Sequence, residues 1–147
     1  MKKMVYGVVI ALGLLLLLSV AVDASDAQDA LQTGLRYYDS KDYGEALKWV
    51  RKSADQGDAK AQGFLGSMYH SGKGVPQNYR EAAKWYRKSA NQGNALAQSS
   101  LGIMYYEGKG VTQSSTEAAK WIVKAAAQGD KLALKVLQDL KEMGHLE

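Results

Sequence analysis

The sequence predicts an all-α fold, a short solenoid of stacked antiparallel helical hairpins with a C-terminal capping helix. Three observations predict it: a repeat of about 36 residues, polar residues and glycines that mark helix ends, and apolar residues at helical spacing. Of the 147 residues, 46% are hydrophobic and 23% are charged, which is typical of one globular domain rather than of a disordered chain.

The repeat is clearest in the second half of the chain. Residues 59–94 align without a gap on residues 95–130, with about 21 of 36 positions identical. Residues 25–58 are a divergent copy that lacks the GKGV found between the two halves of the later copies. Because a single hairpin cannot bury both of its faces, we expect the three copies to stack, with residues 131–147 as a capping helix and tail.

Polar caps predict where the second helix of each repeat begins. A short polar residue is followed three residues later by glutamate, which is the spacing of a capping box. The pairs are Asp42 with Glu45, Asn78 with Glu81, and Ser114 with Glu117. In a capping box the polar side chain accepts from the first turn, and the glutamate reaches back to the amide of the cap.

Glycines predict where these second helices end. Glycine adopts the left-handed conformation that satisfies the last carbonyls of a helix. The glycines are Gly57, Gly93 and Gly129, and each is followed at once by a residue that can cap the next helix, Asp58, Asn94 and Asp130. The helices therefore follow one another almost without a loop, which makes neighbouring helices antiparallel.

Small and aromatic residues predict how the helices pack. Gly66 and Gly102 lie within first helices and allow close approach of the partner helix, at a cost of about 1 kcal/mol each in helix propensity. We expect the tryptophans to fill the space between hairpins and the valines of the GKGV loops to enter the core. These residues are Trp49, Trp85, Trp121, Val75 and Val111.

The first 24 residues have the order of a secretory signal peptide. Lys2 and Lys3 precede an apolar run from residue 5 to residue 22, and small residues follow, so we place cleavage after Ala24. The alternative is an uncleaved inner-membrane anchor, since about 18 apolar residues approach the length that spans a bilayer. Both readings place the body outside the cytoplasm, periplasmic or secreted if cleaved and facing outward if anchored.

The chain has no cysteine, which excludes disulfides, lipoprotein attachment and cysteine-ligated metal. The histidines, His70 and His145, are far apart and have no cluster of carboxylates near them in sequence, so we expect no metal, cofactor or catalytic residue. The GKG triplets lack the strand and third glycine of a phosphate-binding loop, and are predicted to be structural turns. The net charge of +4 becomes about +3 once residues 1–24 are removed, which is too small to indicate a polyanionic partner, and we expect no nucleic-acid partner outside the cytoplasm.

The motifs AxxxLGxMYxxGKGV, from Ala61 and from Ala97, and EAAKW, from Glu81 and from Glu117, resemble the Sel-one-like repeat family. This family is related to the tetratricopeptide repeats. The resemblance covers nearly the whole chain after residue 24, although the first copy is closer to a plain tetratricopeptide repeat. It implies an adaptor that binds a protein or peptide in a concave groove lined by the first helices. Carried over by position, the implied groove residues are Gln28, Leu31, Leu35, Tyr38, Lys60, Gly63, Ser67, His70, Leu96, Ser99, Ile103 and Tyr106.

A second hypothesis comes from the cations of the second helices, which stacking would align into a basic ridge. They are Lys48, Arg51, Lys52, Lys84, Arg87, Lys88, Lys120 and Lys124. Such a ridge is either a solvated face or a surface that attracts anionic membrane or cell-wall polymer. The sequence leaves open the identity of the partner and the oligomeric state.

Overall fold

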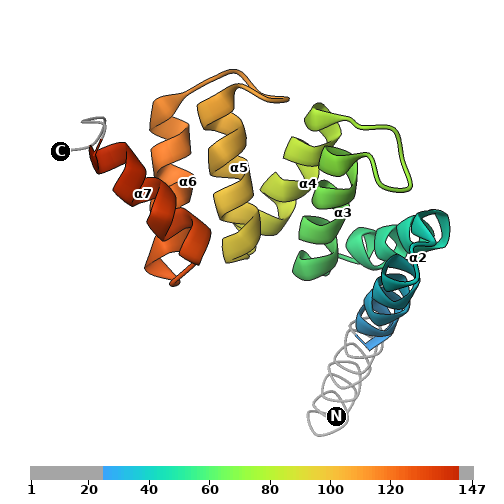
Figure 1. The fold of residues 1–147 in the computed structure, drawn as a ribbon. Helices are drawn as coiled ribbons and strands as arrows, with labels where there is room; N and C mark the ends of the chain where they lie inside the picture. Colours follow the sequence, from blue (N-terminus) through green and yellow to red (C-terminus); the bar gives the residue numbers. More distant parts are fainter. Residues whose placement is uncertain (1–24, 143–147) are drawn as a thin grey trace, which may run out of the picture.

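In a computed structural model, residues 25–142 are described, and within this range the chain forms seven helices and no strand (Figure 1). The all-α prediction is confirmed. The helices are residues 25–39, α2 (Tyr43–Asp55), α3 (Ala59–Ser71), α4 (Tyr79–Asn91), α5 (Ala95–Glu107), α6 (Ser115–Ala127) and α7 (Lys131–Glu142). The predicted signal peptide, residues 1–24, and the last residues of the tail, 143–147, lie outside the described range.

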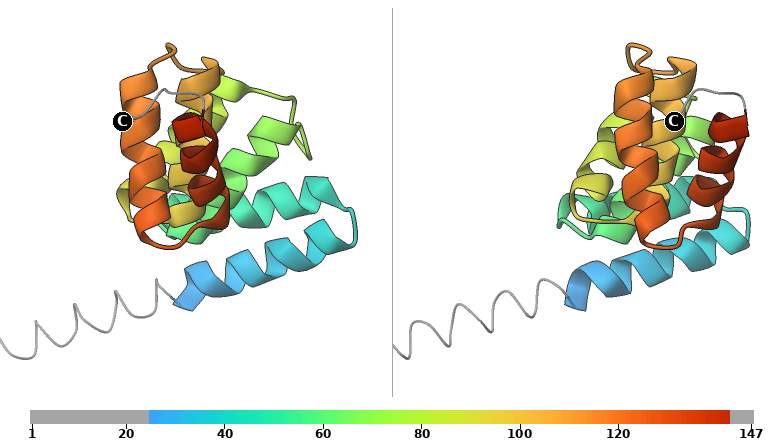
Figure 2. Two further views of the ribbon diagram at one scale, coloured as in Figure 1. Left: turned by 60° about the vertical axis from the view of Figure 1, so that its left-hand side comes forward. Right: turned by 90° about the vertical axis from the view of Figure 1, so that its left-hand side faces the viewer.

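The helices form hairpins that stack side by side along the chain (Figure 2). The pairs α3–α4 and α5–α6 make the most extensive contacts, and α2–α3, α4–α5 and α6–α7 join one hairpin to the next. Helix α7 packs on α6, and no further helix follows it in the described range. The prediction of a C-terminal capping helix is therefore confirmed.

Only one of the two hydrogen bonds of the predicted capping box forms at the second helix of each repeat. The side chains of Asp42, Asn78 and Ser114 accept hydrogen bonds from the first turns of α2, α4 and α6, as predicted. The backbone amides of these caps donate instead to carbonyls of the preceding helices, those of Tyr37, Tyr69 and Tyr105. The prediction that the glutamates reach back to these amides was therefore wrong.

The predicted helix ends are confirmed. Gly57, Gly93 and Gly129 have φ values of +95°, +90° and +82°. The side chains of Asp58, Asn94 and Asp130 accept hydrogen bonds from amides in the first turn of the helix that follows. One residue pair therefore stops a helix and starts the next.

Glycines within the first helices allow the two helices of a hairpin to touch, as predicted for Gly66 and Gly102. A Cβ at Gly66 would lie 2.8 Å from the Tyr86 ring, and one at Gly102 would lie 2.7 Å from the side chain of Ile122. Gly34 meets Val50 in the same way, at 2.7 Å. Each hairpin therefore has one large residue of its second helix lying over a glycine of its first.

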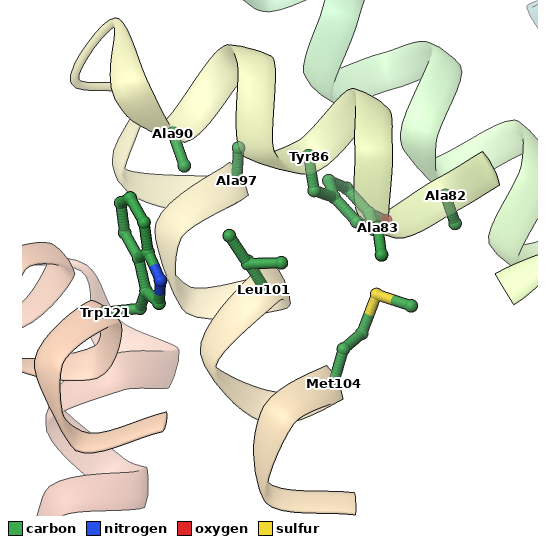
Figure 3. Packing of buried hydrophobic residues seen from close by; sticks show 8 residues of the cluster. All are labelled: Ala82, Ala83, Tyr86, Ala90, Ala97, Leu101, Met104 and Trp121. Atoms are coloured by element: carbon green, nitrogen blue, oxygen red, sulfur yellow. The ribbon is translucent and has the colours of Figure 1, made fainter. Parts of the chain in front are cut away.

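Successive core clusters fill the space between hairpins. One cluster joins α4, α5 and α6 and includes Leu101, Met104 and Trp121 (Figure 3). Trp121 is 6% exposed and lies between the second and third hairpins, while Trp85 packs against the cluster of the first and second. Trp49 has no described hairpin before it and stays half-buried. Val111 packs against the core and Val75 is half-buried.

The GKGV loops connect each repeat to the one before it. Gly74 and Gly110 have φ values of +74° and +71°, and each touches the first turn of the preceding second helix. Lys73 donates a hydrogen bond of 2.7 Å to the hydroxyl of Tyr38. In the described chain no hairpin precedes the first repeat, so a GKGV loop there would have no helix to contact. The loop is thus a structural turn that links repeats.

Candidate binding groove

A hollow of about 530 Å³ lies on the face formed by the first helices of the three repeats. Its walls are apolar side chains from three different repeats, chiefly Leu35, Phe64 and Leu96. Leu96 is 64% exposed, the largest exposure among the large hydrophobic residues of the range 25–142. An apolar side chain so exposed is available to a ligand. Each Å² of its apolar surface that a ligand covers would favour binding by about 25 cal/mol.

The floor of this first hollow carries three hydroxyl groups. Tyr86 reaches it from α4, where its ring covers Gly66, and its hydroxyl lies beside those of Ser67 and Ser100. Burial raises the pKa of Tyr86, and these two serine hydroxyls oppose that rise. The phenol therefore stays protonated at neutral pH and can act as a hydrogen-bond donor to a ligand.

Lys60 is the one charged residue that lines the first hollow. It is exposed and makes no ion pair among the residues from 25 to 142. An ammonium group at the rim of an apolar hollow favours an anionic group on the ligand.

A second hollow of about 230 Å³ follows one repeat later, between α5, α6 and α7. Its walls are apolar, with Ile103, Ile122 and Val136 among them, and Glu107 and Asp139 lie at its edge. It opens into a wider hollow of about 620 Å³ beside the second GKGV loop, with which it shares Tyr106 and Leu140.

The two hollows are equivalent positions of the repeat with different chemistry. Moving 36 residues along the sequence carries Ser67, Tyr86 and Ser100 of the first hollow onto Ile103, Ile122 and Val136 of the second. Where the first hollow has hydroxyl groups, the second has only aliphatic side chains at these positions. In the second hollow these aliphatic side chains pack together in the core cluster that joins α7 to α5 and α6, whereas the hydroxyl groups of the first hollow have no counterpart in that cluster.

Eight of the twelve residues that the resemblance placed in the groove line these two hollows. Leu31, Leu35, Lys60, Gly63, Ser67 and Leu96 line the first, and Ile103 and Tyr106 line the second. The structure brings residues far apart in sequence together on one face. Whether they bind a ligand remains a prediction.

The other four residues lie elsewhere. Ser99 is fully buried and its hydroxyl donates to the carbonyl of Leu96, so its assignment to the groove surface was wrong. Tyr38 packs edge-on against Tyr43 and Phe64 at the loop that joins the first two repeats. The His70 ring contacts Tyr79, and Gln28 is exposed outside both hollows.

The lining residues of the first hollow that the sequence analysis did not assign to the groove are Gln32, Phe64, Tyr86, Asn94 and Ser100. For Tyr86 a signal was present in the sequence. Its equivalents in the first and third repeats, which also lie over a glycine, are the aliphatic Val50 and Ile122. A tyrosine at a position that elsewhere needs only an apolar side chain indicates a use for its hydroxyl.

The cations of the basic ridge have partners within the protein. Lys48, Lys84 and Lys120 pair with the glutamates three residues before them, at 2.5, 2.5 and 3.5 Å. Lys52, Lys88 and Lys124 lie over the rings of Trp49, Trp85 and Trp121, at 5.3, 4.1 and 4.6 Å from the ring centroids. Arg51 and Arg87 donate to the hydroxyls of Tyr69 and Tyr105 in the next repeat. A polyanion would have to compete with these contacts.

The described residues also bear on two other features, a cluster of metal-binding side chains and a membrane-spanning helix. Residues 25–142 contain no group of three or more histidine, aspartate or glutamate side chains placed to hold a metal ion. No helix in this range is both long and apolar enough to cross a bilayer.

Comparisons with known proteins agree with the fold. Several solved structures are similar to this chain, among them the following three. The first is the protective antigen c5321 of uropathogenic Escherichia coli, which has an SLR fold, at 38% identity and a TM-score of 0.78. The second is a Sel1 repeat protein of Oxalobacter formigenes, at 35% identity and a TM-score of 0.73. The third is cysteine-rich protein B of Helicobacter pylori, at 23% identity and a TM-score of 0.60.

The extent of these matches differs. They cover 84%, 84% and 77% of this chain in that order. The chain spans only 27% of the E. coli antigen, but 97% of the Oxalobacter protein and 96% of the Helicobacter protein. No curated protein sequence matches the chain.

The family model of the Sel1 repeat matches residues 25–58, 59–94 and 95–130, which together are most of the chain. The Oxalobacter protein is also a Sel1 repeat protein, and the match covers 97% of that protein. The resemblance stated from the motifs is therefore confirmed, and this chain belongs to the Sel1 repeat family.

Proposed function

We propose that this protein is a non-enzymatic adaptor that binds an extended segment of a partner protein in the groove formed by the two hollows. Sel1 repeats generally mediate protein–protein interaction, and this supports the class of function. The observation that carries the assignment to the groove is Leu96, a large apolar side chain that is 64% exposed within a hollow built from three repeats.

The groove fits an extended chain better than a compact small molecule. Its two hollows are shallow and follow one another along the stack, one repeat apart. Peptide segments bind such grooves through side chains that anchor at successive sites. Because three repeats make a short groove, we expect modest affinity.

The alternative, docking of the basic ridge to an anionic membrane or cell-wall polymer, receives less support. Each of its eight cations already has a carboxylate, an aromatic ring or a hydroxyl as partner. Three of the eight cations are paired with glutamate carboxylates, which lowers the positive charge of the ridge, and a polyanion would have to compete with the other contacts. Strong weakening of binding by salt would favour this alternative over the groove.

We also propose export, with residues 1–24 as a signal peptide cleaved after Ala24. The support is the order of Lys2 and Lys3, the apolar run and the small residues in the sequence. Intact-mass measurement of the protein recovered from producing cells tests this: a chain that begins at Ser25 supports cleavage, whereas the full 147 residues in the membrane fraction would support the anchor.

The groove is tested by two matched substitutions, Leu96→Asp in the first hollow and Val123→Asp outside both hollows. Val123 is 52% exposed on α6, so the two changes alter charge and exposed apolar surface in the same way. Cross-linking and pull-down from envelope extract should retain a partner with the Val123→Asp variant as with the unchanged chain, and lose it with Leu96→Asp. Equal retention by all three proteins would contradict the groove assignment.

A further inference from the structure

The two hollows differ in a way that selects different side chains from one bound segment. The first has hydroxyl groups from Ser67, Tyr86 and Ser100 on its floor and the ammonium group of Lys60 at its rim. The second has only aliphatic side chains at the three equivalent positions. The three aliphatic side chains of the second hollow also pack together in the core cluster of α5, α6 and α7. The hydroxyl groups of the first hollow are the part of the difference that this packing does not explain.

The first hollow suits a carboxylate on an aliphatic stem. Leu35, Phe64 and Leu96 provide apolar walls for the methylene groups. The phenol of Tyr86 can donate to a carboxylate oxygen, and Lys60 supplies the opposite charge. Hydrogen bonds to an ionised acceptor are stronger than those between neutral groups, so this arrangement favours glutamate over glutamine.

The second hollow suits an aliphatic side chain and disfavours a second carboxylate. Its walls are formed by Ile103, Ile122 and Val136, and acidic residues border it. Glu107 is paired with Lys109 at 2.9 Å, whereas Asp139 makes no ion pair within residues 25–142. A ligand carboxylate at this hollow would face that negative charge.

The distance between the two hollows determines how far apart the two anchoring side chains must be in the sequence of the bound segment. The first helices of successive repeats approach one another: a Cβ at Gly63 of α3 would lie 3.8 Å from the Cβ of Ala97 in α5. Helices in contact are about 10 Å apart, and an extended chain rises about 3.3 Å per residue, so the two anchoring side chains are about three residues apart.

We propose that the groove recognises a partner segment in which a glutamate, held in the first hollow, is separated by about three residues from a leucine or isoleucine held in the second. This inference rests on the proposed function, because it names the chemistry of the segment that the adaptor binds.

The test uses synthetic peptides and the protein recovered from producing cells, in the form in which those cells produce it. The probe is the acetylated, amidated peptide Gly-Ser-Glu-Ser-Gly-Leu-Ser-Gly, together with the same peptide in which the glutamate and leucine exchange places. Titration followed by amide chemical shifts gives a dissociation constant and shows which residues are contacted. The tighter of the two peptides is then compared with versions carrying glutamine for glutamate or serine for leucine.

We expect the glutamine peptide to bind about tenfold more weakly than the glutamate peptide. Tyr86→Phe and Lys60→Gln should each reduce this ratio and leave the effect of the leucine unchanged. Ile103→Ser gives the second hollow the residue that the first has at the equivalent position, and it should reduce only the effect of the leucine.

Two outcomes would overturn the inference. If the glutamate and glutamine peptides bind equally while shifts map to the groove, the selectivity is wrong, although the groove still binds peptide. If no peptide shifts residues of either hollow, the proposed segment is wrong. In that case the pull-down with Leu96→Asp and Val123→Asp alone decides whether the groove binds a partner.

Discussion

Gly110 lies against the backbone of Tyr79, so close that a Cβ at position 110 would be 2.2 Å from the Tyr79 carbonyl oxygen. The same relationship joins Gly74 to Tyr43, at 2.1 Å. Both glycines also have positive φ values, +71° and +74°, which other residues adopt at a cost. Two independent constraints therefore require glycine at the centre of each GKGV loop.

Substituting Gly110 by alanine should destabilise the protein by about 2 to 4 kcal/mol, because the new methyl group meets a backbone atom that cannot rotate away and the residue must hold a left-handed conformation. Urea unfolding followed by tryptophan fluorescence measures the change. Gly44→Ala is the control, since a Cβ there is 3.8 Å from its nearest neighbour. It should be neutral or slightly stabilising, and equal losses in the two variants would contradict the close contact.

Lys88→Gln should destabilise the protein by about 0.5 to 1 kcal/mol. The Lys88 ammonium lies 4.1 Å from the centroid of the Trp85 ring, and glutamine removes the charge that the ring attracts. Chemical denaturation measures the free energy of unfolding, and the tryptophan emission should change as well. Lys60→Gln removes the same charge where no ion pair is made and should alter stability by less than about 0.5 kcal/mol. A loss of stability in Lys60→Gln as large as that in Lys88→Gln would refute the proposed role of the ring contact.

Gln62→Leu should cost about 1 kcal/mol. The buried Gln62 amide donates to the carbonyl of Ala54 in the preceding repeat at 3.2 Å, and it accepts from the Gln92 side chain of its own repeat at 2.8 Å. The cost is modest because Gln92 still donates to Gly57, at 3.0 Å. A double-mutant cycle with Gln92→Ala should give a coupling energy of about 0.5 to 1.5 kcal/mol, and additive losses would argue against the link.

Tyr86→Phe should make the protein more resistant to alkaline pH. Burial raises the pKa of Tyr86 above its ordinary value of 10.0, so the folded protein holds this proton more tightly than the unfolded chain. Stability from this group is fully present below pH 10.0 and is lost as the pH rises through the folded pKa. The melting temperature of the unchanged protein should therefore fall more steeply than that of the phenylalanine variant as the pH rises from neutral to strongly alkaline. Parallel curves would contradict the burial of the phenol.

Much of the fold could be predicted from the sequence because its signals are local. The caps at Asp42, Asn78 and Ser114 and the glycines at 57, 93 and 129 act within one turn of the helices they end. The role of Glu45 could not be predicted in this way. Its expected acceptor role at the amide of Asp42 is taken by the carbonyl of Tyr37, and Glu45 pairs instead with Lys48 at 2.5 Å.

The groove was less predictable for a related reason. Matching positions between repeats predicts which face of a first helix a residue lies on. It does not predict whether a side chain of the second helix extends between the first helices into the groove. Tyr86 comes from a second helix and arrives at the floor because Gly66 leaves room for its ring. Ser99 occupies the position of the half-exposed Gly63, yet it is fully buried, because exposure depends on the neighbouring repeat as well as on the helix face.

The backward contact of the GKGV loops gives the array a direction. Each loop contacts residues of the repeat before it: Gly74 lies against Tyr43, and Lys73 donates to Tyr38. Removal of the last repeat would leave the earlier loops with their contacts intact, whereas removal of the first would leave Gly74 and Lys73 without theirs. During synthesis the N-terminal hairpin emerges first, so each new repeat finds its docking site already made.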